Sequence, residues 1–446
     1  MVFQSRLTRY ARTVTCWLGV RLLVAAALLV ALPGHAGEVA SISPADPYSF
    51  KPIVSLTNFG LYESSPFFSA NDRAWLETSL RFGGRFEYKC FAFEAVGIGV
   101  RTSGRDPYGS GNTPQFDFDT LYVQWNQTSG LPFKLTIGRQ PLVLGTQFLI
   151  GDGVYDGFHR GYTEAVYHSP RRSFDAARLE FDAATLHFDS FIYSVNPTWD
   201  GGGERNGWVG GMEVSRSFTK VKSSYAAGLF YRDSPSNLDN NMWLVSLRGE
   251  QHYPGLDDFY VSGEWVGEFG RGNNAAYVTT PNQNLNEHAW HGEVGWQADD
   301  LPLKPFAEAG YVYYSADFTP VATGFSDWGK WYLGNQIDWI IFSTNTRIIR
   351  AEAGFWPDKK VKLRAQYHQT RLVSGPDGPL SDEVSVIGEW FANDHLWVNA
   401  LVGYSMPHGA LAASGLTNPF SFLNADAVPV GNKPSVDFIL AVGINF

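Results

Sequence analysis

The chain ends in SVDFILAVGINF, residues 435–446, and this stretch alternates in polarity. Every second residue from Val436 to Phe446 is apolar, whereas Asp437, Ala441, Gly443 and Asn445 on the other parity are small or polar. Side chains of a strand point to alternate faces, so the pattern predicts a strand with one apolar face. A soluble sheet could bury that face in a core, but termini usually fray. A strand that runs to the last aromatic residue is typical of the closing strand of a membrane barrel.

The same alternation recurs along the chain. In 361–371, Val361, Leu363 and Tyr367 share one face, while Lys362 and Arg364 lie on the other. An Arg or Lys on the lipid face at mid-depth costs roughly 2–4 kcal/mol, so the charged face must line the lumen.

Short and long connections alternate between the apolar-polar segments, as they do in outer-membrane barrels. The expected strands are 51–62, 73–86, 91–101, 116–126, 131–139, 172–182, 185–196, 207–218, 221–234, 242–254, 259–271, 286–299, 304–317, 347–357, 361–374, 381–393, 395–408 and 434–446. The fold class is therefore all-β, a transmembrane antiparallel β-barrel of about 18 strands. An even strand number puts both chain ends on one side, which we expect to be the periplasm. A barrel of this width leaves an aqueous channel.

The N-terminus predicts export. Residues 1–36 combine four arginines, the apolar run 22–32 and a small-x-small site at Gly34-His35-Ala36, which together predict a cleaved signal peptide. Residues 37–50 are then a periplasmic segment and 51–446 the barrel. Cleavage moves the formal charge from −10 to −14, because four arginines and no acids leave. An acidic chain argues against nucleic acid as a partner. Cys90 remains alone, so no intrachain disulfide is expected.

Acids and bases are nearly balanced on the predicted inner face. From this strand phasing, the candidate pore-lining residues are Arg81, Arg85, Arg178, Arg248, Arg350, Lys362, Arg364, Glu264 and Glu268. They could form cross-strand ion pairs that stiffen the wall. Alternatively, the arginines could form a constriction that selects an anionic solute. The faces of 185–196 and 207–218 cannot be assigned from their sequences.

The most distinctive segment is 131–182, which contains the long connection 140–171. Five glycines between positions 145 and 161 argue against a stable helix there. A connection of this length is usually functional or folded inward.

Several short motifs around this loop resemble one known family. Gly138-Arg139-Gln140, Leu144-Gly145, 149–151 (LIG), 172–175 (RSFD), Arg178-Leu179 and the earlier 120–125 (TLYVQW) are similar to the signature of the bacterial alginate export family of outer-membrane porins. The resemblance covers about residues 120–180. It implies an eighteen-stranded barrel with a loop folded into an arginine-lined pore. By motif, it makes Arg139, Arg172 and Arg178 candidate pore or loop-anchoring cations. Residues 152–171 look longer than the family's spacer, and the lumen is more mixed in charge.

These observations predict a passive channel in the bacterial outer membrane for an acidic solute, with an anionic polysaccharide such as alginate as the first expectation. A diffusion porin for small acidic or aromatic solutes is the first alternative. A barrel hydrolase is the second, although His168-Ser169 is the only close His/Ser pair and no third partner is evident. We expect no enzyme activity, cofactor or metal site. Expected partners are outer-membrane lipid, the outer-membrane assembly machinery and a periplasmic export protein. The family resemblance implies a monomer.

Overall fold

The structure is a computed structural model, and it describes a defined part of the chain. The described residues are 48–64, 72–105, 115–127, 132–151, 173–183, 185–195, 207–234, 240–253, 256–272, 283–318, 344–414 and 433–445. The expected signal peptide, the pair His168-Ser169, Arg172 and Phe446 lie outside these residues. The chain divides into the units Met1–Pro47 and Tyr48–Phe446, of which the second contains every described residue.

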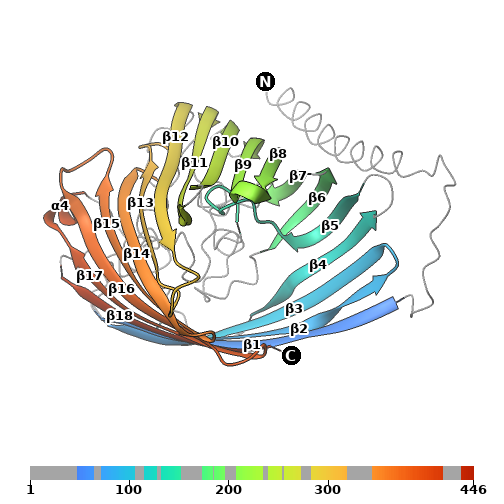
Figure 1. The fold of residues 1–446 in the computed structure, drawn as a ribbon, viewed down its shortest axis with the longest axis horizontal. Coiled ribbons are helices and arrows are strands. Elements are labelled where there is room, and N and C mark those ends of the chain that lie inside the picture. Colours follow the sequence, from blue (N-terminus) through green and yellow to red (C-terminus); the bar gives the residue numbers. More distant parts are fainter. Residues whose placement is uncertain are drawn as a thin grey trace, which may run out of the picture. The chain divides into compact units, whose positions relative to one another are not determined.

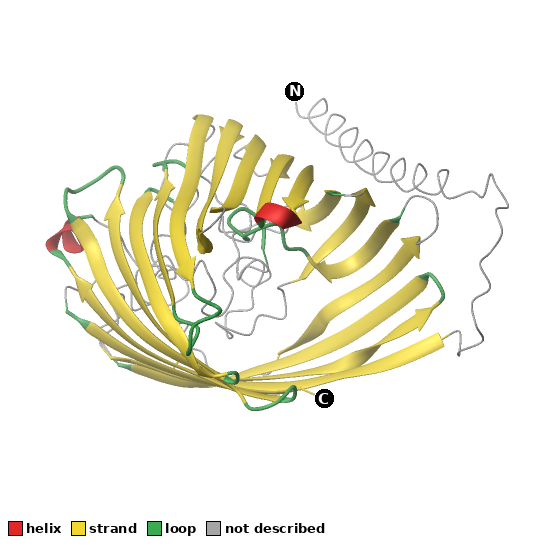
Figure 2. Cartoon of the chain, viewed as in Figure 1, coloured by secondary structure: helices red, strands yellow, loops and turns green. Residues whose placement is uncertain are grey.

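The described residues form 18 strands. Their bounds are β1 Tyr48–Ser64, β2 Arg73–Tyr88, β3 Phe91–Arg105, β4 Gln115–Gln127, β5 Phe133–Pro141, β6 Ser173–Ala183, β7 Leu186–Val195, β8 Gly207–Phe218, β9 Ser223–Ser234, β10 Asn240–Tyr253, β11 Leu256–Gly272, β12 Gln283–Gln297, β13 Phe306–Tyr314, β14 Thr346–Asp358, β15 Val361–Leu372, β16 Pro379–Phe391, β17 Leu396–Pro407 and β18 Ser435–Asn445. Helix is limited within this part of the chain to η1, Thr219–Val221, and α4, Gly409–Ala413 (Figure 2). No helix among these residues is long and apolar enough to cross a membrane.

The strands form one antiparallel sheet that closes on itself (Figure 1). Each strand pairs with its neighbours in sequence, and β1 also pairs with β18, where Ser55 lies opposite Asn445 and Ser64 opposite Val436. The predicted fold class and strand number are therefore confirmed. Links such as 359–360 and 392–395 define the short-turn end of the barrel, and links such as 142–172 and 408–434 define the long-loop end. Which end faces the periplasm stays a prediction.

The two faces of the sheet separate by polarity. On β18, Phe438 and Leu440 are exposed on the outside, whereas Asp437 and Ile439 are buried on the inside. Exposed aromatic and aliphatic side chains continue around the outer face, as lipid contact requires.

The strand at β13 is shorter than expected. We expected a strand over 304–317, but β13 begins at Phe306 and ends at Tyr314. Leu303 and Lys304 have positive φ values of 68° and 41°, and they belong to a turn in which the Ala298 N–H bonds the Pro305 carbonyl at 3.0 Å. A left-handed backbone cannot continue a strand.

An irregularity between β3 and β4 changes which residues face inward. Val96 lies opposite Thr120 and Gly97 opposite Phe118, so Asp119 is an extra residue in β4. Asp119 and Thr120 are both buried inside, whereas Phe118 is exposed outside. The bulge thus places a carboxylate in the lumen that strict alternation does not.

We predict that the cost of a charge on the outer face depends on depth. Val402, in the middle of β17, and Met406, near the long-loop end, are both exposed on the same face. Val402→Arg should lower the free energy of unfolding in lipid vesicles by about 2–4 kcal/mol, and Met406→Arg by at most about 1 kcal/mol. Denaturant titration of the two variants measures the difference. Equal losses would contradict the placement of Val402 at mid-depth in lipid.

Candidate functional site

A network of polar side chains lines the inner face from β2 to β7. Arg85 donates from Nη1 to the Tyr122 hydroxyl at 2.8 Å and from Nη2 to Gln124 Oε1 at 2.7 Å. The Tyr122 hydroxyl in turn donates to Glu94 Oε2 at 2.9 Å. Gln124 Nε2 on β4 donates to Thr136 Oγ1 on β5 at 3.2 Å, so the network extends from β4 to β5.

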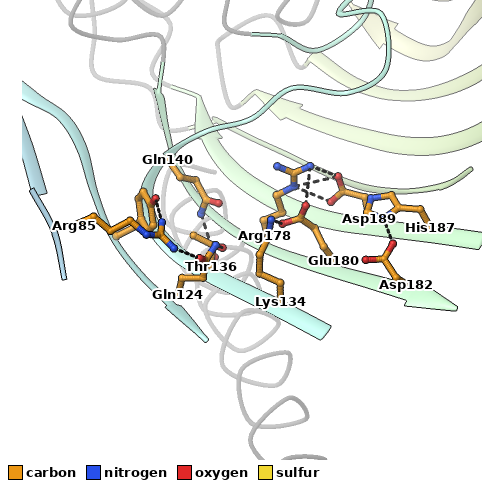
Figure 3. A network of polar contacts seen from close by, with 11 residues as sticks. Arg85, Gln124, Lys134, Thr136, Gln140, Arg178, Glu180, Asp182, His187 and Asp189 are labelled. Atoms are coloured by element: carbon orange, nitrogen blue, oxygen red, sulfur yellow. Dashed lines mark hydrogen bonds and ion pairs between the residues drawn. The ribbon is translucent and has the colours of Figure 1, made fainter. Parts of the chain in front are cut away.

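The network continues on β5, β6 and β7 (Figure 3). Arg178 Nε lies 3.0 Å from Asp189 Oδ1, and its Nη2 lies 3.5 Å from Glu180 Oε1. Lys134 Nζ is 2.5 Å from Glu180 Oε2. Arg81 joins the same face from β2, because its Nε donates to Asp119 Oδ2 at 2.8 Å. We call Arg81, Arg85, Lys134 and Arg178 the basic wall.

In the pairs of Arg81, Lys134 and Arg178 the cation is the more exposed member, whereas Arg85 is 21% exposed and its partner Glu87 37%. The side chains of Arg81 and Lys134 are 39% and 40% exposed, against 10% and 13% for Asp119 and Glu180. Arg178 is 17% exposed and its partner Asp189 only 3%. At Arg81, Lys134 and Arg178 the carboxylates therefore lie closer to the sheet than the cations do. The more accessible charge at these three positions is positive, although the chain is acidic.

A second ion-pair cluster on β12–β16 is more deeply buried. Arg350 Nη1 lies 2.6 Å from Glu293 Oε1 and 3.1 Å from Glu308 Oε1. Gly310 on β13 lies opposite Glu293 on β12 and opposite Arg350 on β14. A Cβ at Gly310 would lie 2.8 Å from Glu293 Cγ, so a side chain there would disturb the ion pair. The Arg350 side chain is only 4% exposed, so this cluster stiffens the wall more than it meets solute.

Arg364 and Lys362 extend the second cluster onto β15 and β16. Arg364 lies 3.4 Å from Glu352 and 3.3 Å from Glu389, and Lys362 lies 4.0 Å from Glu389. Arg85 also lies 2.6 Å from Glu87 and 3.7 Å from Glu94. Each candidate arginine among the described residues therefore lies near a carboxylate, and which of the two interpretations applies stays a prediction.

Residues 142–151 after β5 lie against the inner face of the strands opposite. Thr146 Oγ1 donates to Glu264 Oε2 at 2.9 Å, and the ring of Phe148 lies 4.9 Å from that of His291 and 5.4 Å from that of Tyr314. Arg248 donates two hydrogen bonds of 2.6 Å to Glu213. The Gly145 backbone packs against Arg248, since a Cβ at Gly145 would lie 2.0 Å from Arg248 Nη1. This segment narrows the channel. The rest of the expected inward loop, 152–171, lies outside the described residues.

The motif Gly138-Arg139-Gln140 anchors the start of this segment. Gln140 Nε2 donates to the carbonyls of Thr136 and Ala176, each at 3.1 Å. Arg139 is buried and pairs with Asp117 at 3.4 Å. Arg139 was expected either to line the pore or to anchor the loop, and its buried position fits the anchoring role.

The expected site residues lie at several depths. Glu264 faces residues 142–151, and Glu268 is completely buried on the inner face of β11. Sequence reasoning missed the carboxylates Asp119, Asp189 and Glu213. Asp119 is displaced by the bulge, and the other two lie on β7 and β8, whose faces could not be assigned. A signal was present, since Asp189 is the only formally charged residue of β7.

Among the residues that the structure describes, no group of three His, Cys, Asp or Glu side chains could hold a metal ion.

The fold is similar to that of solved outer-membrane porins. OccK5 (OpdH) of Pseudomonas aeruginosa has a TM-score of 0.56 at 10% identity, with 89% of this chain and 98% of that chain covered. A BenF-like porin from Pseudomonas fluorescens Pf-5 gives 0.57 at 9% identity, with 89% and 98% covered. OccK2 (OpdF) of P. aeruginosa in complex with glucuronate gives 0.54 at 12% identity, with 89% and 96% covered. No family model matches this sequence, and no curated protein matches it.

These comparisons agree with a porin and with the predicted outer-membrane localisation. They do not single out the alginate export family, so the resemblance over 120–180 is supported only at the level of a porin fold. The neighbours are channels rather than enzymes, which is consistent with a channel here.

We predict that Gly138 is required for the anchor. Its φ is +123°, and a Cβ would lie 2.3 Å from the Leu121 carbonyl oxygen. Gly138→Ala should therefore cost about 1–3 kcal/mol of folding stability. Gly292→Ala is the matched control, since a Cβ at Gly292 meets nothing within 4 Å, and it should change stability by no more than about 0.5 kcal/mol. Denaturant titration compares the two, and equal losses would exclude this role of Gly138.

Proposed function

We propose that this chain is a passive diffusion porin of the bacterial outer membrane that favours small acidic solutes. The observation that carries the proposal is the basic wall, in which Arg81, Lys134 and Arg178 are each more exposed than the carboxylates that hold them. Charged groups on a pore surface set the sign of ion that passes. Paired carboxylates hold the cations in place without covering them.

The width of the channel supports a small solute rather than a polymer. A barrel of 18 strands encloses a channel. Residues 142–151 reduce it, because Phe148 and Thr146 reach β12 and β11. Fold likeness to a porin crystallised with glucuronate also supports a small acidic solute. Alginate export, the first expectation from sequence, receives no support from the comparisons.

The geometry favours acidic over aromatic solutes. The aromatic side chains of the inner face are already packed on one another: Phe148 stacks on Tyr314 at 5.4 Å, and Phe191 on Phe230 at 5.7 Å. These rings are buried and offer little free face for a second ring. The basic wall, in contrast, offers exposed cations, since the Arg81 and Lys134 side chains are 39% and 40% exposed.

We predict that removing the exposed cations lowers anion selectivity. In water, a unit positive charge about 8 Å away stabilises a passing chloride and destabilises a passing potassium ion by about 0.5 kcal/mol each, so each loss should reduce the chloride-to-potassium permeability ratio about 5-fold. Arg81→Gln and Lys134→Gln should each do so in a planar bilayer under a potassium chloride gradient. Lys304→Gln is the control, because Lys304 lies in the turn before β13 and is 56% exposed there. An unchanged reversal potential in both wall variants would refute the role of the basic wall.

A second prediction concerns solute choice. Glucuronate and glucose differ by one carboxylate, so their relative rates of entry into proteoliposomes measure the preference for acid directly. The wild type should favour glucuronate, and the Arg81→Gln, Lys134→Gln double variant should lose that preference while glucose entry persists. Adding polyuronate tests the polymer: current block by the polymer, with no preference for glucuronate, would favour polysaccharide passage instead.

A further inference from the structure

Two arginines lie side by side on the outer face at the long-loop end. Arg347 on β14 is directly opposite Arg371 on β15. Arg347 shares its face with the exposed Ile349, whereas Ile348 and Arg350 are buried on the other face. Like charges directly opposite in an antiparallel pair are destabilising. Nothing in the described wall offsets them with an ion pair, since Arg371 bonds only Gln369 Oε1, at 3.2 and 3.0 Å.

This pair lies where lipid head groups begin. Phe355 is exposed on the outer face near the short-turn end of β14, and Arg347 lies eight residues before it on the same strand. For a strand tilted about 40°, this separation is about 20 Å of barrel height, close to the roughly 25 Å apolar band of an outer-membrane barrel. Ile349, Ala351 and Ala353 occupy the face between them.

An aromatic group marks the same level on the neighbouring strands. Tyr313 lies directly opposite Arg347, and its ring lies 5.3 Å from that of His288 and 6.0 Å from that of Trp290. Tyr and Trp gather at membrane–water interfaces. The arginine pair is therefore at the interface and not at mid-depth.

Arg371 is held by a chain of hydrogen bonds. Gln369 accepts from Arg371 and donates from Nε2 to Asp382 Oδ1 at 3.0 Å. Asp382 also accepts from the Tyr367 hydroxyl at 2.7 Å, and its Oδ2 lies 2.6 Å from His408 Nε2. Both carboxylate oxygens are thus occupied, which leaves the guanidinium of Arg371 oriented but without a carboxylate of its own.

We propose that Arg347 and Arg371 bind a phosphate of the phosphorylated glycolipid of the outer leaflet. Arginine forks match phosphate oxygens in a bidentate geometry. An anion between the two guanidinium groups would also relieve their repulsion. Long loops of such barrels face outward, which puts this end in the leaflet that carries that lipid. This binding site lies on the outside of the barrel, so it does not depend on which solute crosses the lumen.

The test compares two lipids that differ only in phosphate. The folded full chain in detergent is titrated with bisphosphorylated lipid A or with lipid A stripped of both phosphates, and retained lipid is counted by native mass spectrometry. The wild type should bind the phosphorylated form more tightly. The Arg347→Gln, Arg371→Gln double variant should weaken that binding about 30-fold, if each arginine near the membrane surface contributes about 5-fold.

Arg216→Gln is the matched control. Arg216 is also exposed on the outer face, but near the short-turn end, where it lies over Phe218. This variant should bind phosphorylated lipid A as the wild type does. Equal binding by the double variant and the wild type, or an equal loss in Arg216→Gln, would overturn the proposal. Displacement of lipid A by millimolar inorganic phosphate would also overturn it, because the site would then recognise a free anion. The single variants serve the same comparison if the double variant does not fold.

Discussion

The hydrogen-bonded seam between β1 and β18 is the contact on which the rest of the barrel depends. Lipid offers no partner to a backbone N–H or carbonyl, so a sheet can cross a membrane only if it has no edge. The seam removes the two free edges of the sheet by pairing β1 with β18 along ten register pairs, from Ser55–Asn445 to Ser64–Val436. Once the backbone is satisfied, the outer face must be apolar and the inner face is free to be polar. The separation of Phe438 from Asp437 on β18 follows directly.

The exposure of charged side chains on the inner face does not follow the negative net charge of the chain. An acidic chain would repel an acidic solute if its carboxylates met the lumen first. Three of the carboxylates that face β2–β7, Asp119, Glu180 and Asp189, are instead less exposed than the cations Arg81, Lys134 and Arg178 that pair with them. Gly310 on β13 lies opposite both Glu293 on β12 and Arg350 on β14. Because Gly310 has no side chain, Glu293 and Arg350 can form an ion pair across β13. Net charge and the sign of the accessible surface are therefore separate properties of this protein.

Alternation of apolar and polar residues was sufficient to predict the fold. Each of the eighteen expected ranges overlaps an observed strand, because lipid imposes a period of two on every segment. The site was harder to predict, since its partners depend on register. Arg81 could be placed inside from sequence, but its partner Asp119 lies two strands away and beyond a bulge. Asp189 and Glu213 lie on strands with weak alternation, and Arg172 lies outside the described residues. The buried, anchoring position of Arg139 depends on the left-handed Gly138, which no periodicity reveals.

The pairing of β1 with β18 also constrains the order of events in folding. The two strands that meet at the seam are the first and the last of the barrel, and Ser55 and Asn445 are 390 positions apart. No other neighbouring pair in the sheet is so distant in sequence, and a contact of this kind forms only after a large loss of chain entropy. Until β18 is available, β1 presents an open edge that can pair with another chain. We therefore expect the seam to close after the local hairpins have formed, and the open edges stay available for pairing with other chains until then.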